Sequence, residues 1–295
     1  MPQVAEAPRV ANLRFDARDL ASATPSTRNR YVDLIRVVSI GVVVLGHQLM
    51  AVLAYRQGSF TGKNLLEIDP GLQWLTWILQ VMPLFFIVGG FTNSISWSSA
   101  QSRGKSYADW LRARAARLLR PSFWFVAFWT ILPVAAVAAG LLPRKIAHVG
   151  GQEVALPLWF LSVYMVSVAA VPALVAVHRR LGPWTFAALG TGALVVDSLR
   201  FGLHVPVIGV VNFALVWLAV IELGFLWHDG ALRRRRWLVW AMTGGGLGVL
   251  AVLVAWFNYP VSMIDLTHGV RSNAFPPSAA LLALAVWQCG AMLLF

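Results

Sequence analysis

The stretch that decides the fold is RYVDLIRVVSIGVVVLGHQLM, residues 30–50. Most of it is apolar enough to cross a membrane as a helix, which takes about 20 mostly apolar residues. Yet Asp33, Arg36 and His47 interrupt it. A charged side chain at the bilayer centre costs at least ~2.5 kcal/mol, so such residues usually face the interior of a helix bundle. The stretch therefore predicts a membrane span with polar chemistry on one face.

The composition of the whole chain is typical of a membrane protein with several spans. Of its 295 residues, 58% are hydrophobic and 12% charged, and the mean hydropathy is +0.69, whereas soluble domains carry about 25% charged residues. The single cysteine, Cys289, excludes a disulfide framework and a cysteine-based metal site. Lys and Arg lie between the apolar stretches, so the net charge of +12 indicates basic loops beside a lipid bilayer, and we predict no nucleic-acid partner.

Eight apolar stretches predict an all-α, polytopic transmembrane helical bundle of about eight spans. They cover residues 32–55, 72–96, 119–140, 157–177, 184–199, 206–227, 237–257 and 276–295. Of the 24 Lys and Arg residues, 17 fall in the N-terminal tail and in every second loop, and 6 fall in the loops between these. The bias predicts a cytoplasmic N-terminus in a multi-pass protein of the cell (plasma) membrane.

The two ends of the chain differ in character. Residues 1–30 are polar and contain three prolines, so we expect a disordered cytoplasmic tail before a membrane domain at residues 31–295. The last nine residues, WQCGAMLLF, are almost wholly apolar. We therefore expect a chain truncated at its C-terminus, with further spans in a longer protein, and leave open whether this piece is active.

Arg36 and His47 share one face of the first predicted helix. A helix turns about 100° and rises 1.5 Å per residue, so the 11 residues between them leave the side chains about 20° apart in rotation and about 16 Å apart along the axis. Asp33, one turn before Arg36, can pair with it. Two interpretations stay open: a solvated helix start with a structural histidine, or a catalytic site with His47 as general base.

Arg114, Arg117 and Arg120 recur every third residue, so they form a slowly turning stripe at the cytoplasmic start of the third predicted helix. Arginine makes permanently charged, bidentate contacts to phosphate, so the group could bind a phosphorylated substrate. The same residues could equally be an ordinary basic cluster at the cytoplasmic face.

Other polar groups in the apolar stretches have both structural and functional interpretations. Asn93 follows two glycines in FFIVGGFTNS, where small residues favour close helix packing; its amide could bond an acceptor substrate or a neighbouring helix. Glu222 is a buried-carboxylate candidate with the same two options. Asp197 and Arg200 are expected to form an exposed pair of little energetic value. The histidine spacings lack a metal-site pattern, so we predict no metal.

Several stretches, in this order, resemble membrane acyltransferase family 3 in its actinobacterial style. They are RYVDLIRVVSIGVVVLGH (residues 30–47), MPLFFIVGGFTNS (82–94), RLLRPSFWF (117–125), LWFLSVYM (158–165), NFALVWLAVIELGFLWHDG (212–230) and SNAFPPSAALLALAVWQ (272–288). The resemblance covers residues 28–295. Family members commonly have more spans than the eight predicted here, which agrees with a missing C-terminal part.

The resemblance implies an enzyme that transfers an acyl group, by expectation acetyl, from a coenzyme A thioester to a hydroxyl. Acyl-CoA would then be the donor substrate, with no bound cofactor. Arg117 and Arg120, and less directly Arg114, would hold the donor, and Arg36 would orient it. His47 would act as base or carry the acyl group covalently.

The acceptor is open. O-acetylation of a cell-envelope carbohydrate or glycolipid is one hypothesis, and a natural product such as a macrolide is another. A third hypothesis is a membrane transporter in which Arg36 and His47 form a substrate or proton site. Acyl length and oligomeric state do not follow from the sequence.

Overall fold

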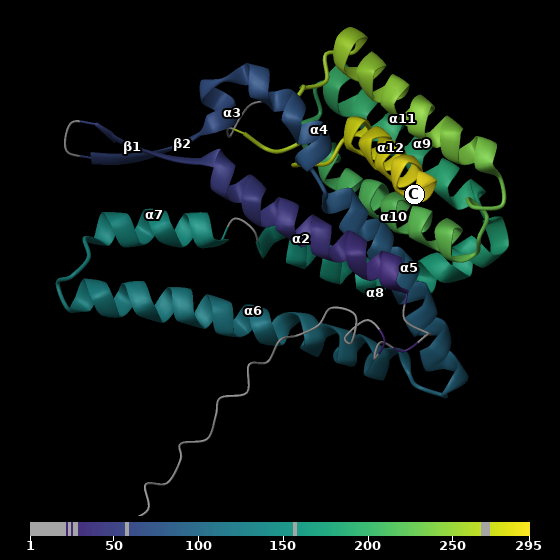
Figure 1. The fold of residues 1–295 in the computed structure, drawn as a ribbon, viewed down its shortest axis with the longest axis horizontal. Helices are drawn as coiled ribbons and strands as arrows, with labels where there is room; N and C mark the ends of the chain where they lie inside the picture. The colour runs from purple at the N-terminus through teal and green to yellow at the C-terminus, as the bar shows by residue number, and fades with distance from the viewer. Residues whose placement is uncertain (1–21, 23–24, 26–28, 57–58, 156–157, 267–271) are drawn as a thin grey trace, which may run out of the picture.

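The computed structural model describes residues 22, 25, 29–56, 59–155, 158–266 and 272–295. The predicted disordered tail at residues 1–30 lies almost wholly outside them. Within the described residues the chain is helical apart from its loops and one antiparallel hairpin, in which β1 pairs with β2 (Figure 1). The elements, in chain order, are α2 (Arg30–Met50), β1 (Ala51–Arg56), β2 (Ser59–Asn64), α3 (Leu65–Ile68), η1 (Pro70–Leu75), α4 (Thr76–Leu79), α5 (Met82–Ser102), α6 (Tyr107–Ala138), α7 (Arg144–Ala155), α8 (Trp159–Leu181), α9 (Trp184–Gly202), η3 (Pro206–Val210), α10 (Val211–His228), α11 (Arg236–Trp256) and α12 (Ala279–Leu294).

Five helical stretches of the described chain are long and apolar enough to cross a membrane. They are Pro70–Ser102, Tyr107–Ala138, Trp159–Leu181, Pro206–His228 and Arg236–Trp256, and the apolar α12 is shorter. These helices support a multi-pass membrane protein. The count of about eight spans and the cytoplasmic N-terminus stay predictions.

One predicted helix end is wrong, and another predicted span belongs to a longer helix. The first span was expected to reach residue 55, but α2 ends at Met50 and the next residues pair in β1; a short apolar run does not by itself distinguish helix from strand. The third predicted span, residues 119–140, lies mostly in α6, which begins further upstream at Tyr107 and so includes Arg114. Ser106 caps it, because its Oγ accepts a bond from the Asp109 amide at 3.2 Å.

Helix α10 lies at the centre of the bundle, and its segment from Val216 to Trp227 is almost entirely buried. Helix α5 crosses α10 so closely that the two backbones lie against each other. A Cβ at Gly90 would lie 2.2 Å from the Ile221 carbonyl oxygen, and one at Gly224 would lie 2.1 Å from the Ile87 carbonyl oxygen. Only glycine fits at these two positions, so the small residues of α5 allow the close helix packing that the sequence predicts.

The buried carboxylate of Asp197, in α9, links α9 to α10, to α12 and to the segment after α11. It lies at the opposite end of the bundle from Arg30. Asp197 accepts hydrogen bonds from Asn212 Nδ2 (2.8 Å), Tyr259 OH (3.0 Å) and the Ala279 amide (2.7 Å). Burial first, and then the Asp197 carboxylate, raise the pKa of Tyr259, so its hydroxyl stays a donor. The expected exposed pair of Asp197 with Arg200 is therefore wrong, because Asp197 is 1% exposed; sequence spacing does not tell which side of α9 packs.

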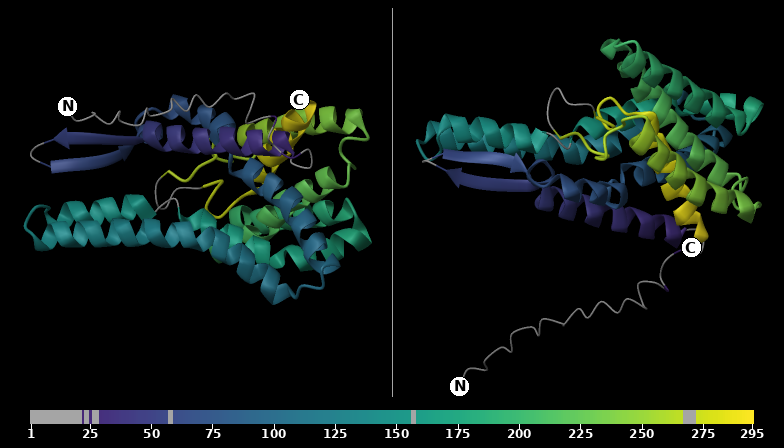
Figure 2. Two further views of the ribbon diagram at one scale, coloured as in Figure 1. Left: turned by 60° about the horizontal axis from the view of Figure 1, so that its bottom comes forward. Right: turned by 90° about the horizontal axis from the view of Figure 1, so that it is seen from above.

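Helices α6 and α7 lie side by side and extend away from the bundle (Figures 1 and 2). The most apolar 18-residue segment of α6 contains no buried residue. Its exposed side chains include Phe123, Trp124 and Phe128. An apolar surface of this size is unfavourable in water, so it is suited to contact with lipid chains or with other helices.

Candidate functional site

Arg36 lies on α2 and is held by α5. Its Nη2 donates a hydrogen bond to Thr92 Oγ1 at 3.1 Å, and its Nη1 lies 3.9 Å from Asp33 Oδ1. Thr92 can accept from Arg36 because its own hydroxyl proton is directed to the Val88 carbonyl oxygen, 2.9 Å away. The guanidinium is half-buried, and its orientation is set by a neighbouring helix.

Tyr164 of α8 is fixed beside this pair. The buried Asn93 donates from Nδ2 to the Tyr164 hydroxyl at 3.2 Å. The ring lies over Gly89, where a Cβ would be 2.8 Å from Tyr164 Cε2, and it meets the edge of Phe86. The structure thus gives Asn93 a defined partner, the phenol of Tyr164.

Arg114 of α6 joins the same group. It is half-buried and lies within electrostatic range of Tyr164, Arg117 and Arg36. We call Arg36, Thr92, Asn93, Arg114 and Tyr164 the arginine cluster. It draws on four helices that are distant in sequence, α2, α5, α6 and α8.

The three arginines of α6 do not share one environment. Each step of three residues turns the helix by about −60°, so Arg120 lies about 120° away from Arg114. Arg117 and Arg120 are both exposed. Arg114 therefore lies within electrostatic range of both Arg36 and Arg117, whereas the helix geometry directs Arg120 to another face of α6.

His47 lies apart from the arginine cluster, three turns further along α2, and its side chain is exposed. Its Nδ1 is 2.8 Å from the Val43 carbonyl oxygen. Because a carbonyl oxygen can only accept, Nδ1 must carry the proton. In the neutral ring Nε2 then holds the lone pair, which is the arrangement a general base needs.

Glu222 belongs to a different polar group. It is fully buried and bonds to His178 Nδ1, at the end of α8, while His178 Nε2 lies 2.8 Å from Asp229 Oδ2. His228 Nδ1 lies 2.8 Å from the other oxygen of Asp229. Burial acts to raise the pKa of Asp229, but the bonds to His178 and His228 outweigh it and hold this pKa below its usual 3.8.

The bond between Glu222 and His178 links α10 to α8. In the described part of the chain, no group of three or more His, Cys, Asp or Glu side chains is arranged to hold a metal ion.

Sequence reasoning missed Tyr164 and the role of Thr92. Both are polar groups inside otherwise apolar stretches, LWFLSVYM and FFIVGGFTNS, and such groups often line functional sites in membrane proteins. That signal was available. The contacts themselves, across 56 residues for Arg36–Thr92 and 71 for Asn93–Tyr164, depend on tertiary packing.

The comparisons with known proteins agree with the resemblance noted from the sequence. A family model described as an acyltransferase domain, acyltransferase-3, matches residues 29–295. No curated protein and no solved structure matches the chain significantly. The family match covers nearly the whole chain and every residue of the arginine cluster, and it supports a membrane O-acyltransferase over a transporter. The chain belongs to the acyltransferase-3 family, and the protein is an acyltransferase.

Proposed function

We propose that this protein moves an acetyl group from acetyl coenzyme A to a hydroxyl of a cell-envelope carbohydrate or glycolipid, in the plasma membrane. The observation that carries the proposal is the arginine cluster, in which Thr92 of α5 holds Arg36 and the half-buried Arg114 lies within electrostatic range of Arg36. Two like charges repel, and Arg114 lies in a helix long and apolar enough to cross a membrane, where a charge is costly. An anionic ligand would relieve both costs.

Coenzyme A supplies such an anion. Its pyrophosphate and 3′-phosphate suit the bidentate geometry of guanidinium groups. Arg36 and Arg114 would hold phosphate oxygens, with Tyr164 as a further donor and Arg117 at the entrance. Arg120 would act only at longer range, through its charge.

The separation of Arg36 and His47 fits the shape of this donor. Coenzyme A carries its phosphates at one end of a long pantetheine arm and its thioester at the other. Groups that bind the phosphates and a base that serves the thioester are therefore expected to lie apart, as Arg36 and His47 do by about 16 Å along α2. This separation makes Arg36 better suited to orienting the donor than to stabilising charge at the reacting carbonyl.

In the proposed reaction, His47 acts through Nε2, the nitrogen that carries the lone pair. The acceptor hydroxyl attacks the thioester carbonyl while Nε2 takes its proton. The tetrahedral intermediate collapses, the carbon–sulfur bond breaks, and the leaving thiolate takes the proton back from the imidazolium. The products are an O-acetyl ester and free coenzyme A. In the covalent alternative, Nε2 itself first accepts the acetyl group and then passes it to the hydroxyl.

A transfer assay tests the proposal. Purified protein in lipid nanodiscs is given radiolabelled acetyl coenzyme A with envelope glycans, glycolipids or a macrolide in separate reactions. We expect labelled ester with a glycan or glycolipid, and its loss in His47→Ala. The control is Arg103→Gln, which removes an exposed charge at the end of α5.

The possible outcomes separate the alternatives. Label on the macrolide alone would replace the carbohydrate proposal by the natural-product one. Full transfer by His47→Ala would contradict the role of the imidazole. Label that stays on the denatured protein, and is lost in His47→Ala, would establish the covalent route.

A further inference from the structure

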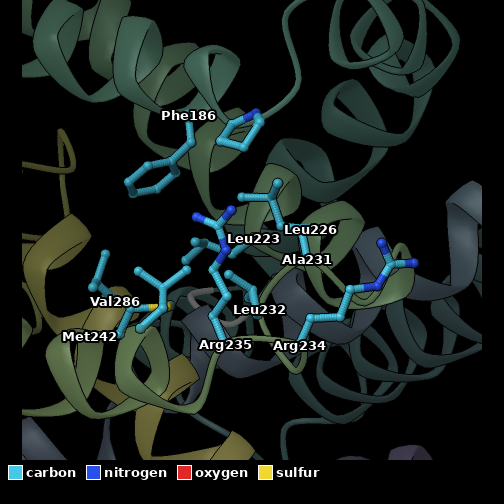
Figure 3. Close-up of a pocket in the computed structure, with 11 residues that line it drawn as sticks. Phe186, Leu223, Leu226, Ala231, Leu232, Arg234, Arg235, Met242 and Val286 are labelled. Atoms are coloured by element: carbon cyan, nitrogen blue, oxygen red, sulfur yellow. The ribbon is translucent and has the colours of Figure 1, made fainter.

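An apolar cavity of about 400 Å³ lies between α9, α10, α11 and α12, away from the arginine cluster. Its volume is within the range of small-molecule sites in proteins. Figure 3 shows Arg235 reaching between Phe186 and Leu223, while Arg234 points away from them. The remaining lining residues are Pro183, Leu226, Ala231, Leu232, Leu238, Met242 and Val286.

The cavity and the arginine cluster lie on opposite faces of α10. Ile221 and Gly224 face α5, whereas Leu223 and Leu226 line the cavity. At 100° per residue the midpoints of these two pairs are about 160° apart around the helix. The cavity is therefore a separate site.

The mouth of the cavity is strongly basic. Arg233, Arg234, Arg235 and Arg236 follow one another up to the first residue of α11, and all four are exposed; Arg234 and Arg235 line the cavity. Helix α11 begins at this run with no side-chain cap on its first amides, so the positive end of its dipole adds to the field. A negatively charged group is favoured at this point.

Exposed tryptophans occur beside the mouth. Trp184 begins α9, and Trp237 and Trp240 lie in the first turns of α11; all three are at least 64% exposed. Tryptophan is enriched at the depth of lipid headgroups. The basic mouth therefore lies where headgroup phosphates lie, with an apolar cavity behind it.

We propose that this cavity binds one anionic phospholipid, with an acyl chain among the apolar side chains and its phosphate on Arg235, supported by Arg234. Basic pockets between membrane helices bind anionic headgroups in this way. Acyl coenzyme A fits less well. Its adenine, ribose and amide groups need hydrogen-bond partners, while the side chains lining the cavity are apolar apart from the two arginines.

The test compares two lipids that share the same acyl chains, phosphatidylglycerol and phosphatidylcholine. Delipidated protein in neutral detergent is titrated with each, and binding is followed by native mass spectrometry and by the rise in unfolding temperature. We expect saturable binding of phosphatidylglycerol about tenfold tighter than of phosphatidylcholine, since Arg234 and Arg235 attract its net negative headgroup.

Three variants assign the binding to this cavity. Arg234→Gln with Arg235→Gln should abolish the preference for phosphatidylglycerol. Ala231→Phe places a large side chain in the cavity from the loop that carries it, and it should weaken the binding of both lipids. Arg103→Gln with Lys105→Gln removes two exposed charges from the α5–α6 loop and should change neither affinity.

Some outcomes would overturn the lipid site. One is equal affinity of the wild type for the two lipids. The other is a control variant, Arg103→Gln with Lys105→Gln, that loses the preference for phosphatidylglycerol as fully as Arg234→Gln with Arg235→Gln does. Displacement of phosphatidylglycerol by acetyl coenzyme A at one shared site would instead assign the cavity to the donor. Because acetyl transfer is measured separately, failure of this site leaves the proposed function standing.

Discussion

Arg36 Nη2 and Thr92 Oγ1 are joined by a hydrogen bond of 3.1 Å that connects α2 to α5. Thr92 gives its own proton to a backbone carbonyl of α5, so its oxygen is committed to accepting from Arg36. This contact determines where the guanidinium lies within the arginine cluster.

Thr92→Val keeps the shape of the side chain and removes the acceptor. Hydrogen bonds to charged groups contribute about 1.5–3 kcal/mol, so we expect the KM for acetyl coenzyme A to rise roughly tenfold with kcat little changed. Thr243→Val is the matched control, since Thr243 makes the same bond to a carbonyl one turn earlier, in α11. An unchanged KM in Thr92→Val would contradict a role in positioning the donor.

Tyr164→Phe leaves the ring in place and removes the hydroxyl that Asn93 bonds. A buried amide left without its acceptor costs about 1–3 kcal/mol, so the free energy of unfolding should fall by that amount. Asn93→Ala should have a smaller effect in the Tyr164→Phe background than in the wild type, because the two groups form one interaction. Additive losses in this double-mutant cycle, measured by denaturant unfolding, would mean that the pair is not coupled.

Gly90→Ala tests the close packing of α5 on α10. The added Cβ would meet the Ile221 carbonyl oxygen at 2.2 Å, so the two helices must separate, at a cost of about 1–3 kcal/mol or more. Gly244→Ala is the control, because its Cβ meets nothing within 4 Å and alanine favours a helix by about 1 kcal/mol. Thermal unfolding in detergent should therefore show a marked loss for Gly90→Ala and no loss for Gly244→Ala.

Asp229→Asn tests the link between α8 and α10 through pH. The folded-state pKa of Asp229 is lowered, so its ionised form stabilises the fold above the usual pKa of 3.8, and this stabilisation is lost as the pH falls through the lowered value. At pH 7 the variant should unfold at a lower temperature than the wild type, and the gap should narrow below about pH 3.8. Asp265→Asn, at an exposed carboxylate, should leave stability unchanged at both pH values.

The sequence was most informative where hydropathy alone decides the structure. Helices cover the centres of all eight predicted spans, and Arg36 stood out because an apolar helix rarely carries a charge. The start of α6 was also readable, since Ser106 with Asp109 is a helix-capping pattern.

Pairings across the bundle could not be predicted in the same way. Asp197 looked like an exposed partner of Arg200, yet it is buried against Asn212 and Tyr259. Glu222 meets His178 across 44 residues. Helix α10 is buried on almost every side, so its sequence has no polar face from which the neighbour of each residue could be inferred.

The most direct test of the account is the equilibrium binding of acetyl coenzyme A to two variants, measured by isothermal titration calorimetry. The account predicts that Arg36→Gln with Arg114→Gln weakens binding at least tenfold, since charge-assisted phosphate contacts are lost. It predicts that His47→Gln binds acetyl coenzyme A like the wild type and transfers no acetyl group. Undiminished binding by the double arginine variant, or full transfer by His47→Gln, would contradict it.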